Sequence, residues 1–136
     1  MKKLKRNSDQ KLALQLRRIN LAMAPLLTTD LLILQELAMK GTLAATELAR
    51  KVQLTSGSMT AALNRLEKGE LVARVTTDLD RRKVFVKLTE EGKAEVIKGN
   101  ARQQKELKKL LGDFSEREVV LLSGLMKRLR KAADGE

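Results

Sequence analysis

The chain has 136 residues, of which 43% are hydrophobic and 33% charged, so we expect one soluble globular domain of ordinary size. It contains no cysteine and no histidine. This excludes a disulfide framework, thiol redox chemistry and the usual zinc sites, and we expect no enzyme activity, no metal and no cofactor. The formal net charge of +11 favours a polyanionic partner such as nucleic acid.

The N-terminal segment is basic, but we do not expect it to be a secretion signal. Polar residues 9–11 follow the basic residues at the point where a signal peptide would have its apolar stretch. No apolar run approaches the roughly 18 residues that a membrane span needs. The expected compartment is therefore the cytoplasm, with no membrane partner.

Two helices are predicted in the first third of the chain. The first covers about residues 9–26, is predicted to end near Pro25, and carries one apolar stripe at intervals of four and three: Leu12, Leu16, Ile19, Met23 and Leu26. Thr28 is the predicted N-cap of the second helix, which Gly41 ends. Residues 31–38 of this helix are apolar nearly all round, so we expect it in the middle of the core.

A helix, a tight connection, a second helix and a hairpin are predicted next. The third helix covers about residues 44–51, and the fourth begins with Thr55 or Ser56 as N-cap and ends at Gly69. One narrow arc of the fourth helix is apolar: Met59, Ala62, Leu63 and Leu66. The alternating segments 71–76 and 83–88 predict a two-stranded hairpin with a charged tip, which needs a helical body to pack against.

The last third of the chain predicts two more helices. One opens at Thr89 and has a polar centre, so it is expected to be long and only partly buried. The other opens with the capping-box residues Ser115 and Glu118. Its apolar stripe consists of Leu122, Leu125, Met126 and Leu129. The predicted fold is therefore mainly α with a small β-hairpin.

The N-terminal end of the fourth helix carries small and polar side chains. A helix that enters the DNA major groove leads with its N-terminus, and small residues there let the backbone approach the base edges. The predicted major-groove residues are Thr55, Ser56, Gly57, Ser58, Thr60, Ala61 and Asn64, and the predicted phosphate contacts are Arg65 and Lys68. Taken alone, this pattern fits an ordinary capped surface helix equally well.

The hairpin tip is strongly charged. Arg81 and Arg82 are predicted to reach the narrow minor groove beside the fourth helix, where the negative potential is enhanced. Asp78 and Asp80 are predicted to orient these arginines by pairing with them. The alternative is that the charges only keep an exposed edge soluble. That alternative is favoured for the hairpin alone, whereas the hairpin and the helix pair together favour DNA binding.

Several short motifs follow one another between residues 48 and 93. They are Leu48-Ala49, Leu54-Thr55-Ser56-Gly57-Ser58-Met59-Thr60, Asn64-Arg65-Leu66-Glu67-Lys68, Leu71-Val72, Arg74, Asp80-Arg81-Arg82 and Leu88-Thr89-Glu90-Glu91-Gly92-Lys93. In order and spacing they resemble the signature of the MarR (multiple-antibiotic-resistance regulator) family. The DRR and LTxxG elements, at this distance after LxxGSxT, are its specific part.

The resemblance implies a winged helix-turn-helix protein that binds pseudo-palindromic double-stranded DNA as a homodimer. Such a protein is usually a repressor, and a small-molecule effector can weaken its affinity. The resemblance also implies that residues 56–64 read the major groove, that Arg81 or Arg82 reads the minor groove, and that the first helix and the last two form the dimer interface. Residues 1–136 would then be a single MarR-like domain, with a winged-helix core at about 28–92 and dimerisation helices at about 9–26 and 93–132.

Three positions depart from the family pattern. Glu70 stands where the family usually has a glycine directly before the Leu-Val pair that opens the wing. Ala44 stands where a Ser or Thr cap is common, and Asp78 replaces a frequent proline. These departures concern local helix ends and the wing.

Two other interpretations remain open from the sequence. A winged helix can serve as a protein–protein interaction module without DNA binding, although such a face usually offers large apolar anchors. An RNA-associated protein would usually stack bases on aromatic residues, and this chain has only two phenylalanines. For an effector pocket the sequence offers Met23, Leu26, Met39 and Phe114, although methionine at helical spacing is more often core filler.

Overall fold

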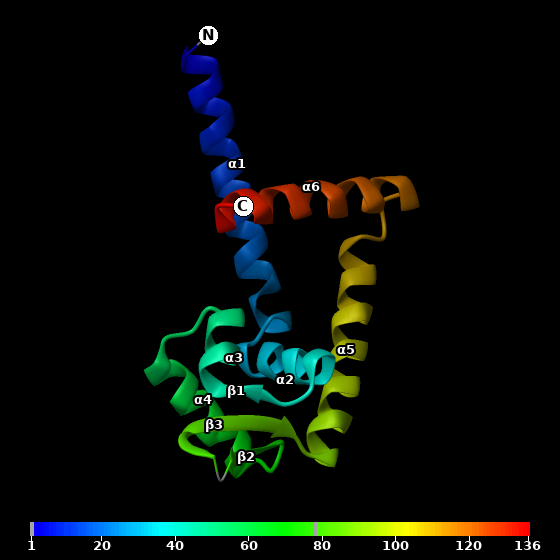
Figure 1. Cartoon of the computed structure of the whole chain (residues 1–136). Coiled ribbons are helices and arrows are strands. Elements are labelled where there is room, and N and C mark those ends of the chain that lie inside the picture. Colours follow the sequence, from blue (N-terminus) through cyan, green and yellow to red (C-terminus); the bar gives the residue numbers. More distant parts are fainter. Residues whose placement is uncertain (1, 78) are drawn as a thin grey trace. The chain divides into compact units, whose positions relative to one another are not determined.

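The computed structural model describes the backbone of residues 2–77 and 79–136, and the side chains of these residues except 2–6, 77, 80 and 81. The chain divides into two compact units, residues 1–100 and 101–136 (Figure 1). The elements, in chain order, are α1 (Lys2–Met23), the 3₁₀ turn η1 (Ala24–Leu26), α2 (Thr29–Lys40), β1 (Leu43–Ala44), α3 (Ala45–Lys51), α4 (Ser56–Lys68), β2 (Val72–Thr77), β3 (Asp80–Leu88), α5 (Glu90–Leu110) and α6 (Glu116–Asp134).

Helix α1 is longer than the sequence predicted. It begins at Lys2 rather than near residue 9, because the segment before Asp9 contains no proline or glycine and consists largely of good helix formers. Its end agrees with the prediction, since η1 contains Pro25. The leucines and isoleucine of its apolar stripe, Leu12, Leu16 and Ile19, are exposed. A large apolar surface on α1 is therefore not covered by the rest of the chain.

Helix α2 forms the centre of the core, as predicted. The side chain of Thr28 caps it, with the Leu31 backbone N–H donating to Thr28 Oγ1 at 3.3 Å. Ile33, Leu34 and Leu37 are almost completely buried. The core cluster continues through α3, α4, the sheet and α5 with Leu43, Leu48, Ala49, Met59, Ala62, Leu63, Leu66, Val72, Val86 and Val96.

The sheet has three strands, not the two that the sequence predicted. Strand β3 lies between β1 and β2, and all pairs are antiparallel. Leu43 of β1 pairs with Val86, and Val72 of β2 pairs with Leu88. Strand β1 was missed because two residues show no periodicity, and its partner lies more than 40 positions along the chain. This third strand ties the base of the hairpin to the start of α3.

The connection from α4 to β2 differs in detail from the expectation. Helix α4 ends at Lys68 with Gly69 as C-cap, as predicted. Gly69, however, has an ordinary φ of −78°, and the left-handed residue is Glu70, with φ +61°. A left-handed conformation costs a residue with a Cβ roughly 1–2 kcal/mol. The chain therefore carries strain at the position where the family pattern has glycine.

Helix α5 packs closely against the start of the wing. The Thr89 backbone N–H donates to the Leu71 carbonyl at 3.1 Å, and Thr89 Oγ1 donates to the Glu70 carbonyl at 2.6 Å. Gly92 is buried, and a Cβ there would lie 2.0 Å from the Leu71 carbonyl oxygen. Only glycine fits this close approach of the two backbones.

Helix α6 begins with the predicted capping box. The Glu118 N–H donates to Ser115 Oγ at 3.2 Å, and the Ser115 N–H donates to Glu118 Oε1 at 2.9 Å. No residue of α6 is buried.

Among the described residues, no single helix is long and apolar enough to cross a membrane. By length and composition, residues 7–26 and 29–40 would suffice only as a pair, and this pair is bent by 72° at its junction.

Candidate nucleic-acid interface

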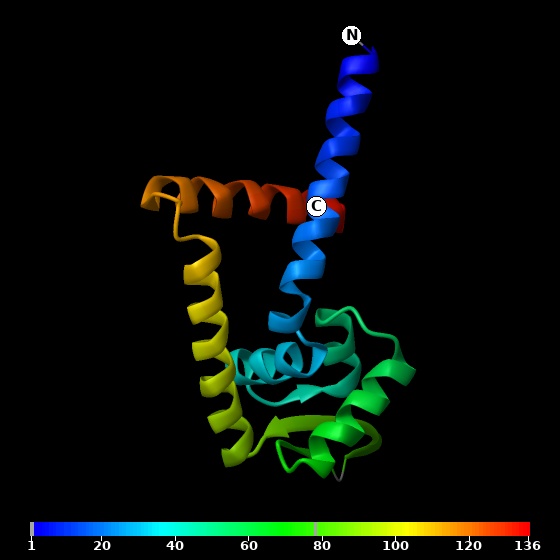
Figure 2. The ribbon, with the colours of Figure 1, turned by 180° about the vertical axis from the view of Figure 1, so that it is seen from behind.

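Helix α4 has one buried and one exposed face. Met59, Ala62, Leu63 and Leu66 are buried against the core. All the residues that the sequence predicted for the major groove or for phosphate are exposed: Thr55, Ser56, Gly57, Ser58, Thr60, Ala61, Asn64, Arg65 and Lys68. Both views show α4 and the β2–β3 hairpin together at the end of the first unit opposite α1 (Figures 1 and 2). The predicted residues thus share one surface with the wing.

The first turn of α4 is held by its own hydroxyl groups. Thr55 Oγ1 donates to Ser58 Oγ at 3.0 Å and accepts from the Ser58 N–H at 3.2 Å. Thr60 Oγ1 donates to the Ser56 carbonyl at 2.9 Å. At Gly57 no heavy atom lies within 4 Å of the position that a Cβ would take. The helix therefore opens with a rigid turn whose backbone is accessible from outside.

Arg65 is engaged within the protein. Its Nη2 atom lies 2.9 Å from Oδ1 of Asp30, so the ion pair links α4 to α2. The hydrogen bond to Asp30 and the charge of that carboxylate raise the pKa of Arg65 above its usual value. The sequence did not reveal this ion pair, because Asp30 lies 35 residues from Arg65 along the chain. Lys68, on the next turn, is exposed.

Arg74 of β2 is a site residue to which the sequence reasoning gave no role. Its Nη2 atom donates to Asn64 Oδ1 at 2.9 Å, and its Nη1 atom lies 3.5 Å from Glu67 Oε2. The sequence pattern could have indicated this role, because residues two apart in a strand share a face. Arg74 therefore shares the face of Val72, which is buried. A cation there needs polar partners, and Asn64 and Glu67 supply them.

The wing tip is described only in part. Asp78 lies outside the described residues, and so do the side chains of Asp80 and Arg81. Their predicted contacts with each other and with the minor groove therefore stay predictions. Arg82 is exposed on β3, which begins at Asp80 and pairs with β2 as far as Thr77.

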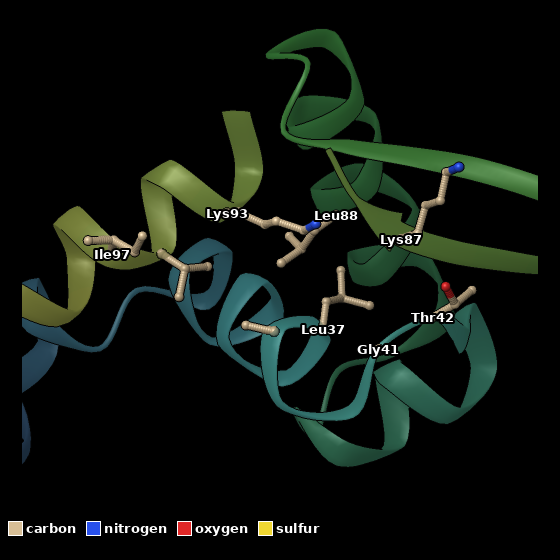
Figure 3. Close-up of a pocket in the computed structure, with 9 residues that line it drawn as sticks. Leu37, Gly41, Thr42, Lys87, Leu88, Lys93 and Ile97 are labelled. Atoms are coloured by element: carbon tan, nitrogen blue, oxygen red, sulfur yellow. The ribbon is translucent and has the colours of Figure 1, made fainter. Parts of the chain in front are cut away.

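A cavity of about 480 Å³ lies between α2, β3 and α5, away from the exposed face of α4 (Figure 3). Its walls are mostly apolar and include Leu37, Leu88 and Ile97. Two lysines also belong to its lining: Lys93 extends between α5 and the sheet, whereas the amino group of Lys87 points away from Leu37 and Leu88. Met23, Leu26, Met39 and Phe114, the pocket candidates from the sequence, do not line this cavity.

Comparisons with known proteins agree on one family. Residues 27–84 match the family model described as MarR family. The HTH-type transcriptional regulator FarR of Neisseria gonorrhoeae is 33% identical over 105 residues, which cover 75% of this chain and 70% of that protein.

Two solved structures have the same fold. One is E. coli MarR complexed with operator DNA, with a TM-score of 0.79, 22% identity and coverage of 90% of this chain and 96% of that one. The other is Bordetella bronchiseptica BpsR, whose DNA binding is regulated by 6-hydroxynicotinic acid. It has a TM-score of 0.78, 21% identity and coverage of 88% and 98%. The winged helix-turn-helix fold that the resemblance implied is thereby confirmed.

Proposed function

Because the chain belongs to the MarR family of transcription regulators, we propose that it binds double-stranded DNA sequence-specifically, as a homodimeric repressor on pseudo-palindromic operators. The observation that carries the proposal is the exposed face of α4, which presents small polar residues and accessible backbone beside the wing. The proposal assigns no catalytic activity. The proposed compartment is the cytoplasm, because the DNA of the bacterial relatives lies there.

In this proposal α4 enters the major groove with its N-terminal end. The exposed residues between Thr55 and Asn64 meet the base edges, and Lys68 meets phosphate. Arg65 links α4 to α2 through its Nη2 atom, which contacts Asp30. Only the other N–H groups of its guanidinium are left for a phosphate contact. Arg81 and Arg82 enter the minor groove, with Asp78 and Asp80 orienting them. The E. coli protein with the same fold is complexed with operator DNA, which supports DNA binding by this fold.

We propose that residues 1–136 act as a single MarR-like domain that dimerises. The DNA-binding core is then about 28–92, and the dimerisation helices are about 9–26 and 93–132. The exposed apolar residues of α1 and α6, among them Ile19 and Leu125, support the second part. A second copy of the chain would cover them and remove apolar surface from water.

The two other interpretations find less support. A protein-binding face centres on large buried anchors such as aromatic side chains, and the exposed face of α4 has none. Base stacking in RNA modules uses exposed aromatic residues. Phe85 lies in the central strand, where it pairs with Ala44 and Val75, and so serves the sheet. Phe114 is exposed, but a single aromatic residue makes no stacking platform for successive bases.

The test is a set of binding isotherms on a selected genomic fragment and on random duplexes, at three salt concentrations. Asn64→Ala should cost about 1–3 kcal/mol on the selected fragment and little on random DNA, because only base contacts carry sequence information. Lys68→Ala should weaken both and lower the salt slope by roughly one unit for each phosphate that the protein no longer neutralises. Arg82→Ala should weaken binding most where the flanks are A·T-rich.

Lys40→Ala is the matched control, because Lys40 is exposed at the end of α2 and lies outside both this surface and the proposed dimerisation helices. It should leave both isotherms unchanged. If Asn64→Ala, Lys68→Ala and Arg82→Ala keep wild-type affinity while their melting temperatures are normal, this surface does not bind DNA. The protein-contact interpretation would then take first place.

We also propose that a small-molecule effector binds in the cavity between α2, β3 and α5. Its volume of about 480 Å³ lies within the range of roughly 300–1,000 Å³ for small-molecule sites. The apolar walls with Lys93 suit an organic anion with a hydrophobic body. Lys93 Nζ lies 3.0 Å from Glu90 Oε1, so its charge is partly balanced in the absence of a ligand. Regulation of BpsR by 6-hydroxynicotinic acid supports an effector of this size.

Naphthoate is a convenient probe, because its fluorescence meets no background in a chain without tryptophan or tyrosine. We expect its fluorescence anisotropy to rise on titration with the protein, while 2-naphthalenemethanol, which has no charge, binds at least about tenfold more weakly. The variant Lys93→Met should lose this preference, and Lys98→Met should keep it. Equal binding of acid and alcohol by the wild-type protein would disprove an anion site here.

A further inference from the structure

Asn64 and Arg74 come from different elements and meet at the DNA-facing surface. Asn64 is exposed on α4, and Arg74 extends from β2 below it. Arg74 Nη2 donates to Asn64 Oδ1 at 2.9 Å, and Arg74 Nη1 lies 3.5 Å from Glu67 Oε2. The Arg74 side chain is 28% exposed. The guanidinium is therefore held from two sides by residues of α4, and in turn it fixes Asn64.

The chemistry of the contact determines which way the amide faces. A guanidinium group has five N–H donors and no acceptor, whereas a side-chain amide has one oxygen acceptor and one NH₂ donor. Only the oxygen of Asn64 can face Arg74, because the NH₂ group would meet another donor. The NH₂ group is then held on the side of the amide away from Arg74, and it is the part of Asn64 left for a ligand.

We propose that Arg74 is a positioning residue that presents Asn64 to DNA as a hydrogen-bond donor. This inference rests on the proposed function and specifies how its reading face discriminates bases. In the major groove, guanine offers the acceptors O6 and N7 and thymine offers the acceptor O4, whereas cytosine offers the donor N4 and adenine offers its acceptor N7 beside the donor N6. Asn64 therefore favours a keto base, guanine or thymine, at one position in each half-site, because an NH₂ group at adenine N7 would also lie beside the N6 donor.

The usual pairing of asparagine with adenine is disfavoured by the same contact. That pairing needs the amide oxygen to accept from adenine N6 while the NH₂ group donates to N7. Here a guanidinium N–H already uses one of the two lone pairs of the oxygen, and its positive charge disfavours a second donor. The contact with Arg74 thus favours a keto partner for Asn64 over adenine.

The experiment is selection from a random duplex library, followed by sequencing, with the wild-type protein and four variants. Asn64→Ala identifies the position, because base preference there disappears. At this position the wild-type protein should enrich guanine or thymine over adenine and cytosine by roughly tenfold. Arg74→Met removes the donor and frees the amide to turn, so adenine should rise to at least equal enrichment. Arg74→Lys restores a donor and should restore the keto preference.

Asn64→Asp provides the opposite test, because a carboxylate only accepts hydrogen bonds. It should reverse the preference toward cytosine or adenine. Thermal melts of each variant show that it is folded, and the Arg74→Lys rescue separates positioning from a general loss of stability. Wild-type preference for adenine at this position, or an unchanged preference in Arg74→Met, would overturn the inference alone. A wild-type protein that enriches no sequence at all would overturn the proposed function with it.

Discussion

Replacing Leu125 and Leu129 by aspartate should convert the protein from a dimer to a monomer and lower its affinity for a palindromic operator by roughly 100-fold or more. Both residues lie on the apolar arc of α6, with side chains 48% and 54% exposed within the single chain. In a dimer this arc would face the partner, and an unpaired carboxylate there would lose its hydration. Each monomer would then hold only one half-site.

Val120→Asp is the control for this substitution. Val120 lies on the same helix and is 73% exposed, but at about 100° per residue it lies roughly 140° around the helix from Leu125. It should leave the dimer intact. Sedimentation at low micromolar concentration gives the oligomeric state. A monomeric wild-type protein would contradict dimerisation itself, whereas a dimeric double variant would exclude this arc of α6 as the interface.

Gly92→Ala should destabilise the protein by about 3 kcal/mol, at the upper end of what an added core methyl group usually costs. The new Cβ would lie 2.0 Å from the Leu71 carbonyl oxygen and 3.0 Å from Leu88 Cδ2. The first obstacle is backbone, and the same carbonyl accepts a hydrogen bond from Thr89. Neither group can move without separating α5 from the wing. The expected loss of melting temperature is roughly 10 °C at fixed protein concentration.

Alanine substitutions at two other glycines provide a comparison for this loss of stability. Gly99→Ala would place its Cβ 2.4 Å from Cδ1 of Leu31, a side chain that can change rotamer, so its cost should be smaller. At Gly124 of α6 nothing lies within 4 Å, and alanine there should stabilise the helix by about 1 kcal/mol. The order of melting temperatures, measured by circular dichroism, should be Gly124→Ala, wild type, Gly99→Ala, Gly92→Ala. A Gly92→Ala melt equal to wild type would refute the close approach of α5 to Leu71.

Local patterns were enough to predict the helices and the position of the hairpin. The apolar arc of α4, the Thr55 cap and the Ser115–Glu118 capping box all depend on residues a few positions apart. The start of α1 was placed too late, because nothing between Lys2 and Asp9 marks a boundary and the helix simply continues. Where spacing along the chain determines the structure, the sequence was sufficient.

Contacts between distant segments could not be predicted in this way. Strand β1 exists only because Leu43 and Ala44 pair with β3. The Asp30–Arg65 ion pair and the Asn64–Arg74 hydrogen bond join residues of different elements. The sequence therefore indicated the surface that we propose to read DNA. The partners that orient its polar groups became visible only when the elements were packed together.

The left-handed conformation of Glu70 affects how many further substitutions the protein can tolerate. Relieving about 1 kcal/mol of backbone strain changes the ratio of folded to unfolded protein by roughly fivefold. A glycine at position 70 would retain the carbonyl that accepts from Thr89 and remove the Cβ that strains the turn. A variant with glycine there should therefore tolerate further substitutions that lower stability. Changes on the exposed face of α4, which we propose to read DNA, are among the substitutions that this added stability would accommodate.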